Sequence, residues 1–340
     1  MAAKQTAKSK AWVIFDRIVA LAAPGGLHSN PWFVAPDGRL SFQPDYDTLE
    51  GLLGVPLHLK AGTQSGVPAL ALDVWLSYEL RRAGFDPHQV WPRPVHPRIL
   101  PAPVANLLKE LPKTLRDAVS DRVSKKASIR GVTSSSASIL GKNYLKQVDV
   151  IITDWDTGPE LLISTKRMDS SYGKNAPNRV EESYGDAKNL RLRHPLAALG
   201  FALGLRSDIL QKERAVADWL FDLLAKLGRE DDAYHATCLV LMKYSDDVAI
   251  PDTGDEPLPA GVPEPGPKVD EEEDAPSPTP VAEVDRDIAQ LPKVTILKEE
   301  TPEELAPSRF LAAMVTRVLA TTPVNMHTEA RRRRASPEMQ

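Results

Sequence analysis

The sequence predicts an α/β protein in which helices flank a mixed β-sheet, preceded by a helical N-terminal region and followed by a disordered acidic C-terminal segment. Two β-type runs, at 147–153 and 160–166, are joined by a polar turn that contains Gly158 and Pro159, a pattern typical of a β-hairpin. Apolar residues recur at helical spacing in the flanking segments. Beyond residue 250 the composition shifts to proline and acidic residues, which predicts disorder because little apolar surface can be buried there.

Helical periodicity accounts for most of the N-terminal third. Apolar residues at helical spacing predict helices over 12–23, 46–53 and 67–83. The proline-rich stretch 87–103 is expected to be extended, because proline lacks the amide hydrogen that a helix interior needs. One or two helices should follow over 104–127, with a break at a proline.

A helix is expected soon after the hairpin. Asn178 can cap its N-terminus and Glu181 stands three residues later, which is the spacing of a capping box. The helix should therefore begin there and run to about Leu192. Two more helices and a buried β-strand should complete the core in the order β-β-α-α-α-β, at 195–210, 212–227 and 236–244.

Composition divides the chain into four regions. These are an accessory region of helices and loops at 1–104, an α/β core at 105–248, a disordered acidic and proline-rich linker at 249–292, and a short strand and helix with a basic tail at 293–340. The net charge of the chain is −4. Residues 251–305 hold 16 acidic and 4 basic residues, a charge of −12, so the remainder carries +8. A mildly basic body is compatible with nucleic-acid binding.

Simple absences exclude several classes of protein. No run approaches the 18 or more apolar residues of a membrane span and the N-terminus lacks the pattern of a signal peptide, so a cytoplasmic location without membrane contact is expected. Cys238 is the only cysteine, stands among apolar residues and is expected to be an inert core thiol. The seven histidines are dispersed and are expected at the surface or in loops. The sequence has no phosphate-binding loop and no zinc motif.

The hairpin carries the candidate chemistry. Side chains alternate along a strand, so Ser164 and Lys166 share one face and Asp149 can lie beside them on the neighbouring strand. A carboxylate next to a lysine can bind a divalent metal and orient a water molecule. Structural roles stay open for both: Asp149 could be a solvated strand-end residue, and Lys166 could reach from a half-buried strand to water. Glu160, roughly 20 Å along the strand from Lys166, is expected to face solvent near the turn.

On these residues, the segment 147–193 resembles the restriction-endonuclease-like superfamily, also called the PD-(D/E)XK nucleases. Asp149 matches the aspartate that begins one strand, with Val148 in place of the usual proline, and Lys166 matches the lysine of the adjacent strand. The resemblance implies a restriction-endonuclease-like mixed sheet. It also implies a type II restriction endonuclease-like deoxyribonuclease that uses Mg²⁺, or Mn²⁺, to hydrolyse phosphodiester bonds in double-stranded DNA. Cutting both strands usually takes two active sites, which favours a homodimer.

Ser164 departs from the pattern, because it stands where the family has its second acid. One interpretation is a subgroup that keeps Ser-X-Lys and takes the missing carboxylate from the next helix, where Glu181 and Glu182 lie. Asp149, Glu181 and Glu182 would then be the metal ligands. Lys166 would orient the attacking water, and Ser164 would hydrogen-bond a metal-bound water. The other interpretation is a catalytically decayed nuclease fold that binds DNA or acts as a scaffold.

Basic residues around this site are the expected DNA contacts. They occupy the strand end, the polar loop and the helix after the hairpin: Arg167, Lys174, Arg179, Lys188, Arg191 and Arg193. Those at the helix C-terminus also suit the helix dipole without any function. Glu182 and Asp186 are four residues apart and should repel each other unless a cation lies between them. The run Arg331–Arg334 either adds nonspecific affinity for nucleic acid or belongs to a disordered tail. A third alternative is a protein-interaction module that acts through the acidic segment.

Overall fold

A six-stranded mixed β-sheet lies at the centre of the computed structural model, which describes residues 6–125, 129, 132–133, 137–229, 233–249 and 279–339. Its strands are β3 (Val90–Trp91), β6 (Val150–Asp154), β7 (Gly158–Met168), β8 (Ala198–Arg206), β9 (Ala236–Lys243) and β10 (Thr295–Ile296). They are arranged in the order β10-β9-β8-β7-β6-β3. The central strands β7, β8 and β9 run parallel, whereas the outer pairs are antiparallel.

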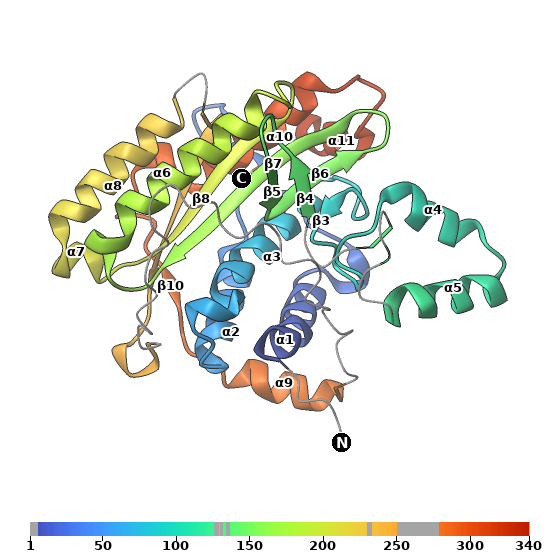
Figure 1. Ribbon diagram of the computed structural model, residues 1–340, viewed down its shortest axis with the longest axis horizontal. Coiled ribbons are helices and arrows are strands. Elements are labelled where there is room, and N and C mark those ends of the chain that lie inside the picture. Colours follow the sequence, from blue (N-terminus) through green and yellow to red (C-terminus); the bar gives the residue numbers. More distant parts are fainter. Residues whose placement is uncertain are drawn as a thin grey trace.

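Helices cover both faces of this sheet (Figure 1). One face shares a hydrophobic cluster with α1 (Ala7–Ala22), α2 (Tyr46–His58), α3 (Val67–Arg82) and α10 (Pro307–Thr321). The other face shares a second cluster with α6 (Tyr172–Arg191) and α8 (Arg214–Leu227). Because strand side chains alternate, Ile152 packs in the first cluster and Ile151 in the second. The described chain is therefore a three-layer α/β structure in which the N-terminal helices form part of one layer.

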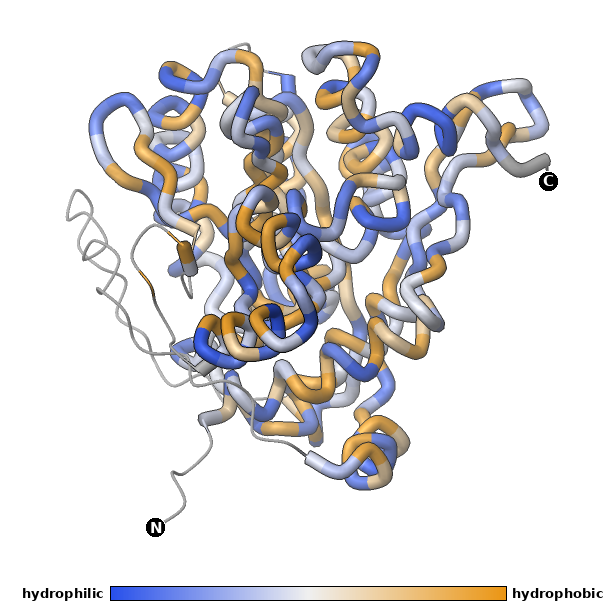
Figure 2. Tube along the Cα trace, turned by 90° about the vertical axis from the view of Figure 1, so that its right-hand side faces the viewer, coloured by the Kyte–Doolittle hydropathy of each residue, from blue (hydrophilic) through white to orange (hydrophobic). Residues whose placement is uncertain are grey.

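The remaining elements lie around these layers. A small sheet joins β1 (Trp32–Val34), β2 (Leu40–Phe42) and β11 (Glu338–Met339), and a separate hairpin joins β4 (Ala137–Leu140) and β5 (Leu145–Val148). The other helices are α4 (Ala102–Glu110), α5 (Lys113–Lys125), α7 (Ile209–Lys212), α9 (Val281–Ala289) and α11 (Thr328–Ala335), and the 3₁₀ turns are η1 (Pro24–Gly26), η2 (Thr63–Ser65), η3 (Asp246–Val248) and η4 (Glu303–Leu305). Hydrophilic residues are frequent in the peripheral turns, and hydrophobic residues follow the packed elements (Figure 2).

The α/β class and many of the predicted elements are confirmed. The hairpin is β6–β7, the helix predicted over 67–83 is α3, and the strand predicted over 236–244 is β9. The helix predicted over 212–227 is α8, although it begins two residues later. Cys238 is fully buried in the first cluster, and this burial raises the pKa of its thiol, which agrees with the expected core position.

Two elements of the core differ from the prediction. The segment predicted as a helix over 195–210 contains β8, so the main elements of the core follow the order β-β-α-β-α-β. All of β8 is buried, and a parallel strand covered on both faces has a continuous apolar sequence without alternation. The helix after the hairpin begins at Tyr172 rather than Asn178. Asn178 and Glu181 therefore lie inside α6, and the predicted capping box does not form.

Two C-terminal segments are more regular than predicted. Helix α9 lies within the linker that was expected to be disordered at 249–292, whereas 250–278 is outside the described residues. The run Arg331–Arg334 belongs to α11, and Arg331 donates a hydrogen bond to the carbonyl oxygen of Leu319 at 2.9 Å. In the described part of the chain, no helix combines the length and the apolar character that a bilayer crossing requires.

Candidate functional site

Asp149 stands at the junction between the β4–β5 hairpin and strand β6 of the main sheet, and it is half-buried. Its Oδ2 atom accepts a hydrogen bond from the backbone N–H of Thr165 at 2.7 Å. Thr165 lies on β7 between Ser164 and Lys166. The structure therefore brings Asp149 next to the triplet with which the sequence analysis grouped it.

A second carboxylate, which the sequence analysis missed, comes from α3. Asp73 is buried, and its Oδ1 accepts a hydrogen bond from the Thr165 hydroxyl at 2.5 Å. Burial, followed by the negative charge of Asp149, raises the pKa of Asp73 well above its ordinary value. The signal in the sequence was a single acid between Leu72 and Val74, in a stretch where the neighbouring helical positions are apolar.

The side chain of Lys166 leaves β7 on the face opposite to that of Thr165 and contacts α6. Its Nζ lies 3.0 Å from Oε1 of Glu182, whose Oε2 is 3.3 Å from Nη1 of Arg179. Burial raises the pKa of Glu182, but the positive charges of Lys166, Lys146 and Arg179 outweigh that effect and lower it to about 2. Glu182 is therefore ionised at neutral pH, and its charge is balanced by neighbouring cations.

Glu182 and Asp186 were expected to repel each other unless a cation lies between them. Lys146 on β5 is that cation. Its Nζ is 2.6 Å from Oδ2 of Asp186 and 3.7 Å from Oε1 of Glu182. The Tyr144 hydroxyl donates a further hydrogen bond to Asp186 at 3.2 Å. Lysines and acids therefore alternate along this edge of the site, and the Lys146 ammonium contacts both helix carboxylates.

Ser164 and Glu181 lie differently from the residues just described. Ser164 is buried, on the same face of β7 as Lys166. Glu181 is exposed on α6. Successive residues of an α-helix point about 100° apart, so Glu181 does not share the direction in which Glu182 meets Lys166.

The six cations predicted to contact DNA divide between surface and interior. Lys174, Lys188 and Arg193 are exposed. Arg179 pairs with Glu182, and Arg191 is half-buried and donates to the carbonyl oxygen of Ala233 at 3.3 Å. Arg167 lies inside the molecule, with its side chain 1% exposed and its Nε 2.9 Å from Oδ2 of Asp169. An interior guanidinium held by an acid has no surface to offer to a phosphate backbone.

Glu160 was predicted to face solvent, and His327 to lie at the surface or in a loop. His327 does lie in the loop before α11, but the side chains of both residues are buried. Each side chain is 2% exposed, and His327 Nε2 is 2.7 Å from Oε2 of Glu160. The hydroxyl of Thr157 donates to Oε1 of Glu160 at 2.5 Å. The prediction of a solvent-facing Glu160 is wrong because the chain segment before α11 packs over this end of β7 and supplies a polar partner.

The fit of a divalent cation depends on Asp73 and Asp149. Among the described residues, no group of three or more His, Cys, Asp or Glu side chains is arranged to hold a metal ion. Two carboxylates held by one threonine are nevertheless hard oxygen ligands of the kind that Mg²⁺ and Mn²⁺ accept, and such ions usually retain several water ligands. Burial and the charge of Asp149 outweigh the positive charges of Lys8 and Lys166, so the pKa of Asp73 stays raised. A bound cation would oppose both effects.

Comparison of this chain with known proteins found no relative. No protein-family model, no curated protein and no solved structure matches the chain.

Proposed function

We propose that this protein is a Mg²⁺-dependent deoxyribonuclease of the restriction-enzyme type, which hydrolyses phosphodiester bonds in double-stranded DNA. The observation that carries the proposal is the meeting of Asp149, Asp73 and Lys166 on two consecutive residues of β7. Asp149 and Asp73 both bind Thr165, and Lys166 follows it directly. The Thr165 and Lys166 side chains leave opposite faces of β7, but the charge of Lys166 still reaches Asp73 and acts to lower its pKa. Two carboxylates and a nearby lysine are side chains that can support metal-assisted hydrolysis of a phosphodiester.

Each side chain has a role in this proposal. Asp149 and Asp73 would hold the cation, which when bound stabilises negative charge on phosphoryl oxygens and lowers the pKa of water. Lys166 would contact the scissile phosphate or orient the attacking water. Glu182 fixes the position of the Lys166 ammonium through the 3.0 Å contact. Asp73 is a better second ligand than Glu182, because a metal at Glu182 would compete with three cations that already neutralise it.

The exposed cations of the loop and helix after the hairpin would bind the DNA backbone. Lys174 and Lys188 lie on α6, and Arg193 follows its C-terminus. Contacts of this type are independent of base sequence and weaken with salt. Two copies of the chain would be needed to cut both strands at once, so the proposal includes a homodimer on DNA.

A second candidate function is a DNA-binding or scaffolding protein with a nuclease-like site that no longer cuts. It is favoured by Ser164, which offers a hydroxyl where the resembling family has a carboxylate, and by the pairing of Glu182 and Asp186 with lysines. This candidate predicts salt-sensitive DNA binding that needs no metal.

The test is a cleavage assay on mixed duplex DNA with Mg²⁺ or Mn²⁺. The native protein is compared with Asp149→Asn, Asp73→Asn and Lys166→Met, and the exposed turn variant Asp156→Asn serves as the matched carboxylate control. We expect metal-dependent cleavage that falls by at least about 100-fold in the three site variants and is unchanged in the control. Cleavage that survives all three substitutions would exclude this site.

Metal binding is measured separately, because an unsuitable DNA sequence could hide cleavage. Titration of Mn²⁺ into the protein in a calorimeter should show binding that weakens in Asp149→Asn and Asp73→Asn. The variants Glu182→Gln and Glu181→Gln then show whether a helix carboxylate is the second metal ligand. Retained Mn²⁺ affinity in both favours Asp73, and loss only in Glu182→Gln favours the helix carboxylate. DNA binding without metal affinity in the native protein would establish the second candidate.

A further inference from the structure

A cavity of 910 Å³ lies away from the candidate site. It is open to solvent on one side and is lined by α1, the turn after it, the C-terminal end of α3 with its following loop, and the segment that leads into α11. Its wall includes apolar side chains such as Val19 and Phe85, the polar residues His28 and Arg81, and three acidic residues: Asp16, Asp86 and Glu329. The volume falls in the range of about 300–1,000 Å³ that small-molecule sites occupy.

Arg81 is the unusual residue of this wall. It is 4% exposed. Its guanidinium donates to the carbonyl oxygen of Pro92 at 3.1 Å and to the Ser77 hydroxyl at 3.3 Å, while its buried Nε has no hydrogen-bond partner. Burial, followed by the charge of Arg98, lowers the pKa of Arg81 to about 9. Within the described ranges, Arg81 forms no ion pair: the charge of Asp16 acts on it, but Asp16 is hydrogen-bonded to Arg98. The cavity wall therefore contains a buried cation without a directly bonded anion.

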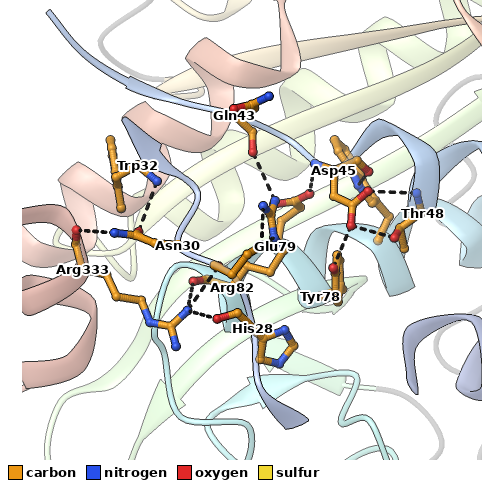
Figure 3. A network of polar contacts seen from close by, with 12 residues as sticks. His28, Asn30, Trp32, Gln43, Asp45, Thr48, Tyr78, Glu79, Arg82 and Arg333 are labelled. Carbon is orange, nitrogen blue, oxygen red and sulfur yellow. Dashed lines mark hydrogen bonds and ion pairs between the residues drawn. The ribbon is translucent and has the colours of Figure 1, made fainter. Parts of the chain in front are cut away.

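The neighbouring arginines do have carboxylate partners. Arg82 Nη1 is 2.7 Å from Oε2 of Glu79, and Arg98 makes two hydrogen bonds to Asp16, at 2.7 and 2.8 Å. In Figure 3 the Arg82–Glu79 pair lies beside Arg333, which donates to the carbonyl oxygen of Arg82 at 2.7 Å. Nε of Arg333 is in turn 2.7 Å from Oε1 of Glu329.

His28 adds a second unused polar atom. Its Nδ1 is buried without a hydrogen-bond partner. Burial, followed by the charges of Arg81, Arg333 and Arg82, lowers the pKa of His28 to about 4, so the ring is neutral at neutral pH. A neutral imidazole can donate or accept a hydrogen bond at this atom, depending on its tautomer. His28 and Arg81 both line the cavity.

We propose that this cavity binds a small organic anion, with an acidic head group paired to Arg81 beside the neutral ring of His28, and with an apolar body against Val19 and Phe85. A buried guanidinium without a directly bonded anion is unfavourable, and a bound carboxylate or phosphate would pair with it. The site is independent of the proposed nuclease function, because none of the candidate site residues lines the cavity.

The test uses a fluorescent anion of this class, 1-anilinonaphthalene-8-sulfonate, titrated into the full chain. We expect saturable binding whose Kd rises by about tenfold or more in Arg81→Met, as the loss of a charge-assisted hydrogen bond predicts. Arg93→Met is the matched control. Arg93 is also a buried arginine, 5% exposed and without an ion pair among the described residues, but it does not line the cavity. Its substitution should leave the Kd within about twofold.

A neutral analogue, N-phenyl-1-naphthylamine, separates charge recognition from apolar binding. Its affinity should not change in Arg81→Met. Competition with octanoate and with octyl phosphate then distinguishes a carboxylate from a phosphate head group. If Arg81→Met does not fold, Ala20→Trp, at an exposed position of the same wall, fills the cavity and should abolish binding of the sulfonate. Equal sulfonate affinity in the native protein and in the Arg81 or Ala20 variant overturns the proposal, as does an equal loss in Arg93→Met.

Discussion

Asp73 and Asp149 accept hydrogen bonds from one residue, Thr165: its hydroxyl lies 2.5 Å from Oδ1 of Asp73, and its backbone nitrogen 2.7 Å from Oδ2 of Asp149. The two acids come from α3 and from the edge of β6, which pack on β7 from different directions. Their charges oppose each other where burial already disfavours ionisation. The charges of Lys8 and Lys166 offset this only in part, because the pKa of Asp73 remains raised, and the proposed cation would stabilise the pair further.

The first prediction concerns Asp73→Asn and the pH dependence of stability. The pKa of Asp73 is raised in the folded state above its ordinary value of 3.8. The folded protein therefore binds a proton that the unfolded chain releases, and this group lowers the free energy of unfolding as the pH rises above that value. Asp73→Asn should lose this dependence and be more stable than the native protein at pH 7 in EDTA, as measured by urea denaturation.

The same experiment with Mn²⁺ tests the metal. At a free concentration of about 100 times its Kd, the ion should stabilise the native protein by about 2.7 kcal/mol and Asp73→Asn by much less. The control is Asp218→Asn, an acid 56% exposed on α8, which should change neither result. A native protein that gains no stability from Mn²⁺ would contradict the proposed metal site.

The second prediction is that Lys146→Met destabilises the protein by about 3 kcal/mol, because it leaves the buried carboxylate of Asp186 without its cation. The two side chains are 14% and 8% exposed and lie 2.6 Å apart. Lys226→Met is the control, since Lys226 pairs with Asp222 at 2.5 Å but both are about 60% exposed; it should change stability by less than about 1 kcal/mol. Thermal and urea unfolding measure the stability of both variants. Equal losses in the two would show that the buried Asp186 carboxylate does not need Lys146 for its stability.

The third prediction concerns the buried pair that links β7 to the segment before α11. Glu160→Ala should destabilise the protein by about 3 kcal/mol, because it removes the partner of His327 from a site where each side chain is 2% exposed. Glu303→Ala, at a side chain 83% exposed, is the control and should have little effect. A double-mutant cycle with His327→Gln should give a coupling energy of roughly 0.5–3 kcal/mol, the usual range for contacting residues. A coupling near zero would show that the contact contributes nothing to stability.

The sequence could predict the part of the site that is local in the chain. Asp149, Lys166 and Glu182 lie on adjacent elements, a strand edge, its hairpin partner and the next helix, so strand alternation and helix order were enough to group them. Asp73 belongs to a helix far earlier in the sequence, and only tertiary packing of α3 on β7 brings it to Thr165. Local patterns carry no information about such a contact.

Tertiary contacts also explain why the helix after the hairpin begins earlier than predicted. The backbone N–H of Gly173, in the first turn of α6, donates to Oε2 of Glu213 at 2.8 Å. The first N–H groups of a helix need acceptors, and here one acceptor comes from the N-terminus of α8. The spacing of Asn178 and Glu181 indicated a local cap, but an acceptor from a distant residue allows the helix to start at Tyr172.

The last prediction tests the strand that the sequence analysis took for a helix. Strand β8 packs so closely against α10 that a Cβ atom at Gly200 would lie 2.7 Å from Cζ of Phe310 and 2.9 Å from Sδ of Met314. Gly200→Ala should therefore destabilise the protein by about 1–3 kcal/mol through overpacking. Gly185→Ala, in α6 with nothing within 4 Å of the added atom, should instead stabilise it by about 0.5–1 kcal/mol. Adding Phe310→Leu should recover part of the Gly200→Ala loss in urea denaturation. Opposite signs for the two glycines require β8 to lie under α10, because in a free helix both substitutions would stabilise.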